Sequence, residues 1–313
     1  MPRFHILITD GLDPSGQSIL RALAEVDDRT DISPNDLLSA VGNYDGLIIR
    51  GRTRVTPAVI DAATSLKVIG RAGVGVDNID LEAARNRNIT VVNAPVATTS
   101  AVAELAFGLM LALAREIPRA DAGMKRGEWL KKELLGIELA GKTLGIIGFG
   151  RIGMELGRRA SVFGMSIVAY DPFVQADVIR AGGADSVSLQ DLYAWSDFIS
   201  LHLPFDVQSR DLIGPMAIGQ MKDGVRIICA ARGGIIDESA LLDALNSGKV
   251  AGAALDVFEA EPPGMTELVA HPRVIATPHI GAETAEAQAR AAEDIAHEVL
   301  AALQGKPLKW RIT

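Results

Sequence analysis

Cysteine, aromatic residues and positive charge are all scarce in this chain of 313 residues. Its one cysteine, Cys229, excludes an intramolecular disulfide and is typical of a protein from a reducing compartment. The net charge of −8 argues against non-specific binding to nucleic acid or to an anionic membrane. An anionic substrate is not excluded, because a local cluster of basic residues can outweigh the overall charge.

Long apolar runs and an amino-terminal targeting signal are missing as well. No uninterrupted apolar stretch approaches the ~18 residues that a membrane span needs. Residues 1–5 do not resemble a signal peptide, so we expect a cytoplasmic protein. Aromatic residues make up only 4 % of the chain, so Ala, Val, Ile and Leu must fill the core, including the strand that contains Cys229. The length fits about two domains.

A glycine-rich turn is the most informative motif that is present. Gly148-Phe149-Gly150-Arg151-Ile152-Gly153 follows an apolar segment, residues 143–147, and precedes a helical pattern. The first glycine permits a tight turn, the second lets a pyrophosphate approach the backbone, and the third lets helix and strand pack closely. The helix N-terminus adds N–H groups and a partial positive charge. The motif predicts a dinucleotide-binding turn made by Gly148, Gly150, Arg151, Ile152 and Gly153.

An acidic residue completes this motif. Asp171 follows the next expected strand, residues 166–170, where its carboxylate can accept hydrogen bonds from the adenosine ribose. It favours NAD over NADP, because a carboxylate repels a 2′-phosphate and no Arg or Lys lies between Pro172 and Ile179. We therefore expect NAD as the cofactor and no metal; a purely structural turn is the alternative.

Short apolar segments alternate with helical patterns along the chain, which predicts parallel sheets covered by helices on both faces. In the first series the expected strands are residues 4–9, 46–49, 68–71 and 90–93, and the expected helices are 16–24, 57–63 and 81–86. In the second series the expected strands are 143–147, 166–170, 198–203, 225–230, 250–257 and 274–277, with a helix at 238–247. The fold class is therefore α/β, with two doubly wound domains: a flavodoxin-like substrate domain and a Rossmann NAD-binding domain.

Two further helices bear on the domain organisation. Residues 101–115 are apolar nearly all round, so this helix should be buried, in part by another subunit. A last helix follows the final strand and is long enough to return to the first domain. We predict a discontinuous substrate domain of residues 1–98 plus 284–313, an NAD-binding domain of residues 99–283, and no third domain.

Four polar residues lie near the end of an expected strand of the second series or follow it, at the edge where open α/β sheets bind ligands: Arg232, Asp256, Glu261 and His279. The glycine pair after Arg232 indicates a backbone that another group approaches closely. Arginine grips a carboxylate with two parallel hydrogen bonds. Histidine can take the proton of an alcohol as its hydride leaves, and a carboxylate on the other ring nitrogen stabilises the imidazolium. Each residue alone is compatible with a structural role, but together they predict dehydrogenation of a 2-hydroxy acid.

The remaining histidines differ from His279. We expect His5, His271 and His297 to be structural, since they lie in a strand, a turn and a helix. His202 ends a strand, and we expect it to touch the cofactor without acid–base work.

Five stretches together resemble the D-isomer-specific 2-hydroxyacid dehydrogenase family, and the resemblance covers nearly the whole chain: residues 70–80, 148–153, 229–237, 255–263 and 278–281. The resemblance implies a two-domain dimer with the active site in the interdomain cleft. The apolar helix around Ala101–Leu111 matches the dimer-forming region of the family. The longer members carry a C-terminal regulatory domain, and we expect the short form without it.

The resemblance also implies roles for individual residues. Arg232 matches the substrate-binding arginine, His279 the acid–base and Glu261 its partner. The N–H groups of Val74 and Gly75 match the loop that binds the substrate carboxylate. Asp256 matches the residue near the nicotinamide amide, and further cofactor contacts are expected at Pro172, His202, Leu203, Pro204, Ala230, Ala231 and Gly281.

Within the family the chain is most similar to members that oxidise D-3-phosphoglycerate, the first step of serine biosynthesis. Arg50 and Arg71 end strands at the cleft edge and could bind the phosphate. For Arg52 and Arg54, ordinary surface charge is an equal alternative. Thr98 stands in the substrate-facing loop where many relatives carry Asn.

Other functions stay open on the sequence. A glyoxylate or hydroxypyruvate reductase, or another D-2-hydroxyacid dehydrogenase working in either direction, would share this site. An NAD(H)-sensing corepressor shares the fold but usually carries extra tails. A methyltransferase can share the glycine-rich turn, but it would not need Arg232, Glu261 and His279 together.

Overall fold

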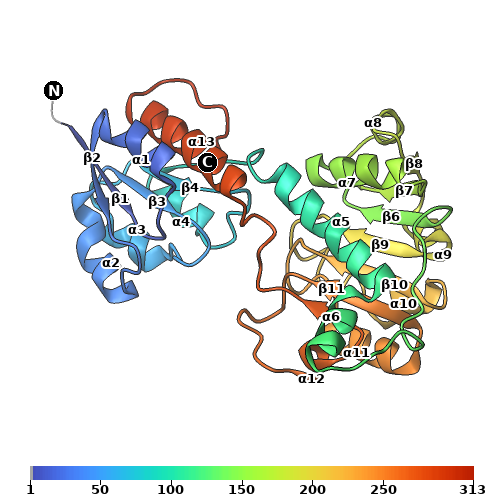
Figure 1. Ribbon diagram of the computed structural model, residues 1–313. Helices are drawn as coiled ribbons and strands as arrows, with labels where there is room; N and C mark the ends of the chain where they lie inside the picture. Colours follow the sequence, from blue (N-terminus) through green and yellow to red (C-terminus); the bar gives the residue numbers. More distant parts are fainter. Residues whose placement is uncertain (1–2) are drawn as a thin grey trace. The chain divides into compact units, whose positions relative to one another are not determined.

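The computed structural model describes residues 3–313. Residues 1 and 2 of the segment that does not resemble a signal peptide lie outside the described residues. The chain divides into two compact units, residues 1–98 with 282–313 and residues 99–281 (Figure 1). Each unit has one parallel sheet with hydrophobic clusters on its two faces. The predicted α/β fold with two doubly wound sheets is confirmed.

The sheet of the first unit has five parallel strands in the flavodoxin-like order β2-β1-β3-β4-β5. They are β1 (Phe4–Ile8), β2 (Ala24–Asp28), β3 (Gly46–Ile49), β4 (Val68–Arg71) and β5 (Thr90–Asn93). Alternate side chains of β1 enter opposite faces: Ile6 and Ile8 join one cluster and Leu7 the other. Both faces are therefore covered, as a parallel sheet requires.

Three helices of this unit begin with the same local signal, a capping residue followed by proline. Asp13, Ser33 and Thr56 each accept a backbone N–H of the first turn. The helical segments are α1 (Pro14–Arg21), α2 (Pro34–Ala40), η1 (Val41–Asn43), α3 (Pro57–Ala62), α4 (Leu81–Asn86) and α13 (Ala285–Leu303). α13 packs against α1 and β4, so the end of the chain completes the first unit.

The sheet of the second unit has seven parallel strands in the order β12-β11-β10-β9-β6-β7-β8. They are β6 (Thr143–Ile147), β7 (Ser166–Tyr170), β8 (Asp185–Ser186), β9 (Phe198–Leu201), β10 (Val225–Cys229), β11 (Val250–Leu255) and β12 (Val274–Ala276). The strand order reverses between β6 and β9, which is the switch point of a Rossmann sheet.

The helices of this unit cover both faces of its sheet. They are α5 (Thr99–Arg115), α6 (Ile117–Lys125), α7 (Arg151–Val162), α8 (Ala176–Ala181), α9 (Leu189–Trp195), α10 (Pro215–Gln220), α11 (Glu238–Ser247) and α12 (Glu267–Ala270). Burial raises the pKa of Cys229 to about 11, so this thiol is a core group, as expected. Among the described residues, no helix is both long and apolar enough to cross a bilayer.

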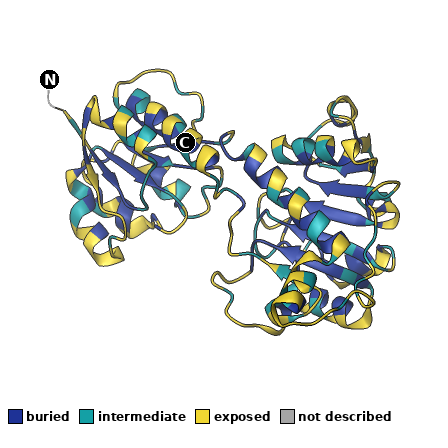
Figure 2. Cartoon of the chain, viewed as in Figure 1, coloured by how far each residue is buried: buried dark blue, intermediate teal, exposed yellow. Residues whose placement is uncertain are grey.

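The apolar helix α5 is buried mainly by its own unit. It packs against α7, β10 and β11, and its buried residues extend from Ala101 to Ala114 (Figure 2). Within the segment predicted to form a dimer, Glu104 and Gly108 are exposed. The even spread of apolar residues therefore reflects a helix wedged between a neighbouring helix and the sheet.

Two strands, β2 and β8, were not predicted from the sequence. β2 carries only two buried side chains, Ala24 and Val26, among acidic ones, because it is an edge strand. β8 is also an edge strand and has only two residues. Neither has the continuous apolar run that marks the central strands.

Candidate active site

The glycine turn between β6 and α7 has a different constraint at each glycine. Gly148 has φ +91°, and a Cβ there would lie 2.4 Å from the carbonyl oxygen of His202. A Cβ on Gly153 would lie 2.3 Å from the carbonyl oxygen of Gly148, so the helix packs directly on the turn. No atom lies within 4 Å of a Cβ built on Gly150, which leaves the backbone open to an approaching group. The turn thus fits a dinucleotide pyrophosphate.

Asp171 lies beside this turn at the end of β7. Its Oδ2 accepts the N–H of Phe149 at 2.8 Å, and its Oδ1 accepts the N–H of Phe173 at 2.9 Å. The carboxylate therefore joins the glycine turn to the loop that contains Pro172. This is the place in a Rossmann fold where a ribose is recognised.

His202, at the end of β9, has a neutral ring. Burial lowers its pKa to about 4, and its Nε2 lies 2.8 Å from Oγ of Ser200. Its own carbonyl is the group that faces Gly148. The backbone of His202 and Leu203 thus lies next to the glycine turn, and the His202 ring carries no positive charge at neutral pH.

His279 and Glu261 form a hydrogen-bonded pair. The distance from Nδ1 of His279 to Oε2 of Glu261 is 2.7 Å. This hydrogen bond is the largest cause that raises the pKa of His279, and the negative charge of Glu261 adds to it. Burial, the largest single cause, acts to raise the pKa of Glu261, but the hydrogen bond and charge of His279, the N–H of Phe258 and the charge of Arg232 together lower it. The pair therefore favours an imidazolium beside a carboxylate.

Arg232 is electrostatically coupled to both members of the pair: its positive charge lowers the pKa of His279 and that of Glu261. Its Nη1 donates to the carbonyl of Ala231 at 2.7 Å. The structure thus brings three predicted catalytic side chains into one neighbourhood, although their roles stay predictions.

The neighbouring glycine pair has a structural explanation. A Cβ on Gly233 would lie 1.8 Å from the carbonyl oxygen of Phe258. A Cβ on Gly234 would lie 2.9 Å from the ring of Phe205. The group that approaches this backbone closely is therefore the chain itself.

Asp256 fixes the turn that carries His279. This carboxylate is buried, and Oδ1 accepts from Thr277 Oγ1 at 2.6 Å and from the N–H of Ile280 at 2.9 Å. Its Oδ2 accepts the N–H of Gly281 at 2.8 Å. The residue between these partners, His279, has φ +53°, an unfavourable conformation for a side chain with a Cβ. Asp256 thus holds His279 by its backbone while Glu261 holds its ring.

Two of the predicted substrate residues of the first unit lie at the ends of neighbouring strands. Arg50 follows β3 and Arg71 ends β4, and Ile49 is paired with Arg71 in the sheet. Arg52 instead binds within the fold, donating to the carbonyl of Thr9 at 2.5 Å. Arg50 and Arg71 thus remain the candidate phosphate ligands, and Arg52 has a structural role.

The loop that contains Val74 and Gly75 is tied down by its carbonyls. The carbonyl of Gly73 accepts from the N–H of Ala94 at 3.0 Å, and that of Val74 accepts from Nδ2 of Asn93 at 2.7 Å. A Cβ on Gly73 would lie 1.5 Å from Nη1 of Arg71, so this glycine makes room for the guanidinium. The loop and Arg71 are therefore fitted to each other.

Two asparagines that support these loops were missed in the sequence. Asn78 donates through Nδ2 to the carbonyls of Arg50 and Thr53, at 2.9 and 2.7 Å, and Asn93 holds Val74. These partners are 19 to 28 residues away along the chain. No local pattern marks such contacts, so only the fold reveals them.

Thr98 and the remaining cofactor candidates have simpler settings. Thr98 is buried, and Arg290 donates through Nε and Nη2 to the carbonyl of the preceding residue, Ala97. Ala230 and Ala231 directly follow β10. Within residues 3–313, no cluster of His, Cys, Asp and Glu could hold a metal ion.

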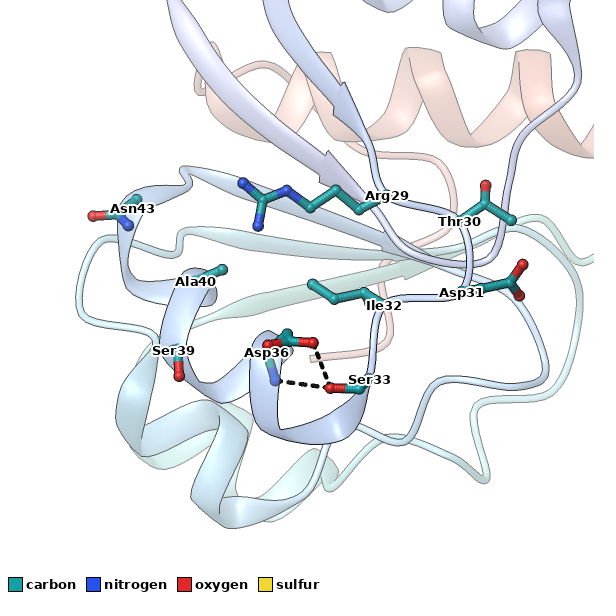
Figure 3. A pocket seen from close by; sticks show the side chains of 9 residues that line it. All are labelled: Arg29, Thr30, Asp31, Ile32, Ser33, Asp36, Ser39, Ala40 and Asn43. Atoms are coloured by element: carbon teal, nitrogen blue, oxygen red, sulfur yellow. Dashed lines mark hydrogen bonds between the residues drawn. The ribbon is translucent and has the colours of Figure 1, made fainter.

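A separate cavity of about 600 Å³ lies between the end of β2 and α2, and none of the predicted site residues lines it (Figure 3). Ser33 and Asp36 on its wall bind each other: Ser33 Oγ donates to Asp36 Oδ2 at 2.6 Å and accepts its N–H at 3.2 Å. These polar groups serve the cap of α2. The lining residues are Arg29, Thr30, Asp31, Ile32, Ser33, Asp36, Ser39, Ala40 and Asn43.

Known proteins similar to this chain agree with the geometry. Residues 107–281 match the family model "D-isomer specific 2-hydroxyacid dehydrogenase, NAD binding domain". The chain is 49 % identical over 302 residues to a D-3-phosphoglycerate dehydrogenase from Methanocaldococcus jannaschii; the match covers 96 % of this chain and 58 % of that relative. The chain thus spans little more than half the length of this curated relative.

Solved structures match along their full length. The TT0316 protein from Thermus thermophilus has a TM-score of 0.90 and 36 % identity, covering 99 % of this chain and 100 % of that one. A glyoxylate reductase from Paecilomyes thermophila has a TM-score of 0.91 and 33 % identity, covering 100 % and 99 %. The matching family model is that of an NAD-binding domain, which confirms the predicted NAD cofactor. The chain belongs to the D-isomer specific 2-hydroxyacid dehydrogenase family.

Proposed function

We propose that this chain is an NAD-dependent D-2-hydroxyacid dehydrogenase and that D-3-phosphoglycerate is its favoured substrate. The observation that carries the chemistry is the 2.7 Å bond between His279 and Glu261, with Arg232 coupled to both. The substrate rests on Arg50 and Arg71 at neighbouring strand ends, and on the similarity to a D-3-phosphoglycerate dehydrogenase.

His279 moves the proton in this mechanism. Glu261 occupies Nδ1, so Nε2 is the ring atom that takes the hydroxyl proton of the substrate. The ring becomes an imidazolium, which the carboxylate of Glu261 stabilises. In the reverse direction the same imidazolium returns the proton to the keto oxygen.

Binding and orientation fall to other groups. Arg232 binds the substrate carboxylate with its planar guanidinium. In the first unit, the N–H groups of Val74 and Gly75 are the proposed substrate ligands. The turn with Gly148, Gly150 and Gly153 would hold the pyrophosphate of NAD. When bound, NAD supplies the hydride acceptor. Asp171 selects NAD over NADP by repelling a 2′-phosphate.

A substrate panel tests this function directly. Formation of NADH is followed by absorbance with D-3-phosphoglycerate, D-glycerate and D-lactate at matched concentrations. We expect the highest kcat/KM with D-3-phosphoglycerate, and Arg71→Gln should remove most of that advantage while sparing D-glycerate. A negligible rate with D-3-phosphoglycerate would contradict the proposed substrate.

A glyoxylate or hydroxypyruvate reductase is the second candidate. The structural similarity to a glyoxylate reductase supports it, since one site chemistry serves both reactions. Faster reduction of glyoxylate or hydroxypyruvate than of phosphohydroxypyruvate, with NADH as reductant, would decide in its favour.

We also propose a cytoplasmic homodimer that associates through the region around Ala101–Leu111 and the segment after it. Four large apolar side chains of that segment are exposed: Ile117, Met124, Trp129 and Leu135. Exposed apolar groups gathered in one segment are typical of an interface. Analytical ultracentrifugation of the wild type and of Trp129→Glu tests the dimer, and cell fractionation tests the location.

A further inference from the structure

One candidate phosphate ligand already carries an anionic partner from its own unit. Nη2 of Arg50 lies 2.6 Å from Oε1 of Glu283, and both side chains are partly exposed. At this distance the contact is a charge-assisted hydrogen bond. Arg50 thus binds a carboxylate at the position where the proposed function requires it to bind a phosphate.

The backbone of Arg50 is held firmly, so its guanidinium has a limited reach. Its N–H donates to Oδ2 of Asp10 at 2.8 Å, and its carbonyl accepts from Nδ2 of Asn78 at 2.9 Å. β3 lies between β1 and β4, so Arg50 leaves the sheet at an interior strand, beside the reversal of strand order. Ligands bind at this edge of such sheets.

The position of Glu283 is equally defined. It immediately precedes Thr284, whose side chain caps α13, a helix of 19 residues. The carbonyl of Ala282, on its other side, accepts from the N–H of Thr284 at 3.0 Å and from Nε2 of Gln288 at 2.9 Å. A carboxylate here is stabilised both by Arg50 and by the positive end of a long helix. These are the features that would also attract a phosphate.

We propose that Glu283 is a specificity-determining residue: its carboxylate competes with the phosphate of a phosphorylated 2-hydroxy acid for Arg50. The proposal rests on the proposed function, in which Arg50 is a phosphate ligand. A phosphorylated substrate must break the Arg50–Glu283 pair and then lie near a negative charge. An unphosphorylated substrate leaves the pair intact, so Glu283 narrows the difference in affinity between the two substrate classes.

Glu283→Gln tests this competition. Glutamine keeps the shape and can still accept a hydrogen bond from Arg50, but it carries no negative charge, so the ion-pair attraction is lost. Exposed ion pairs contribute little, so the gain in affinity for a phosphate is modest, and loss of the nearby negative charge adds to it. We expect the KM and dissociation constant for D-3-phosphoglycerate to fall about fivefold, with those for D-glycerate unchanged.

Glu286→Gln is the matched control. Glu286 is exposed in the first turn of α13 and has no bond to Arg50 in the described structure. Its substitution removes the same charge three residues away from Glu283. In this variant, KM and the dissociation constant for both substrates should stay within about twofold of the wild-type values. An equal gain in Glu286→Gln would show a general field effect and overturn the proposal.

Calorimetry separates this inference from the proposed function. D-3-phosphoglycerate and D-glycerate are titrated into the NADH-bound protein, independently of turnover. If no variant oxidises D-3-phosphoglycerate but Glu283→Gln binds it more tightly, the substrate is wrong and the competition stands. Unchanged, weaker or undetectable binding of D-3-phosphoglycerate in Glu283→Gln overturns the competition, whatever the turnover.

Discussion

The two units share a parallel-sheet architecture but hold their charged side chains in different ways. In the second unit, His279 is fixed twice: Asp256 binds the backbone around it and Glu261 binds its ring. In the first unit, the backbone of Arg50 is fixed by Asp10. Its guanidinium forms a salt bridge with Glu283, whose side chain is partly exposed. One unit holds a side chain in a single pose, and the other holds a side chain whose partner can be exchanged.

This difference matches the separate demands of proton transfer and substrate recognition. Proton transfer needs a fixed distance and a tuned pKa: the buried carboxylate of Asp256 fixes the turn, and the partly exposed carboxylate of Glu261 raises the pKa of His279. Recognition of a mobile anion needs a charge that can change partners, and an exposed ion pair costs little to break. We therefore expect substitutions in the second unit to impair every substrate, and those around Arg50 to change only the choice among substrates.

The largest expected effect is that of His279→Ala. Removing the general base should lower kcat by ~10²–10⁴-fold with phosphorylated and unphosphorylated substrates alike. NAD binding, measured by calorimetry, should survive because the glycine turn is untouched. His297→Ala, on the exposed side of α13, is the control and should keep wild-type kinetics. A loss confined to one substrate class would break the comparison between the units.

Arg232→Lys should have the next largest effect. Lysine keeps the charge but loses the planar fork, and bonds to charged groups contribute about 1.5–3 kcal/mol. We expect kcat/KM to fall by roughly 10–100-fold for all 2-hydroxy acids. Arg158→Lys, an exposed replacement on α7, should change little. Wild-type kinetics in Arg232→Lys would remove this residue from the site.

Asp256→Asn tests the backbone support of His279. Asparagine replaces one accepting oxygen by a donor that faces an N–H or a hydroxyl, which should lower the free energy of unfolding by about 1–3 kcal/mol. kcat should fall as well, because the turn at His279 relaxes. Urea denaturation measures the stability. Asp243→Asn, at an exposed position of α11, should stay within about 0.5 kcal/mol of wild type.

Glu261→Gln should have the smallest and most specific effect. The hydrogen bond and charge of Glu261 raise the pKa of His279, so their removal lowers that pKa. Oxidation requires the unprotonated ring and increases with pH through this pKa. The His-dependent step in the pH–rate profile should therefore move to lower pH. An unmoved step would mean that Glu261 does not hold the ring during turnover.

Much of the fold followed from local patterns. Central strands such as β3, β4 and β10 are rich in buried apolar residues, and they lie at or within one residue of the predicted ranges. The strands β2 and β8 were not found, because β2 has only two buried side chains among acidic ones and β8 has only two residues. Helix α5 was recognised as buried, but its covering elements could not be predicted.

The candidate site divides in the same manner. The residue types and strand ends predicted Arg232, Glu261 and His279 as a group, and the structure places these three together. The action of Asp256 on the turn of His279 and the pairing of Arg50 with Glu283 could not be predicted. The second of these contacts joins residues 233 positions apart.

By itself, the sequence determined the alternation of strands and helices, the glycine turn with its acidic partner, and the caps that start the helices. These are local properties, because they depend on neighbours within a few residues and on the periodicity of apolar side chains. Only the tertiary structure decided which carboxylate binds which basic group. It also decided which glycines lie against the backbone of another segment. Such contacts form between distant segments, and packing of the two sheets with their helices brings those segments together.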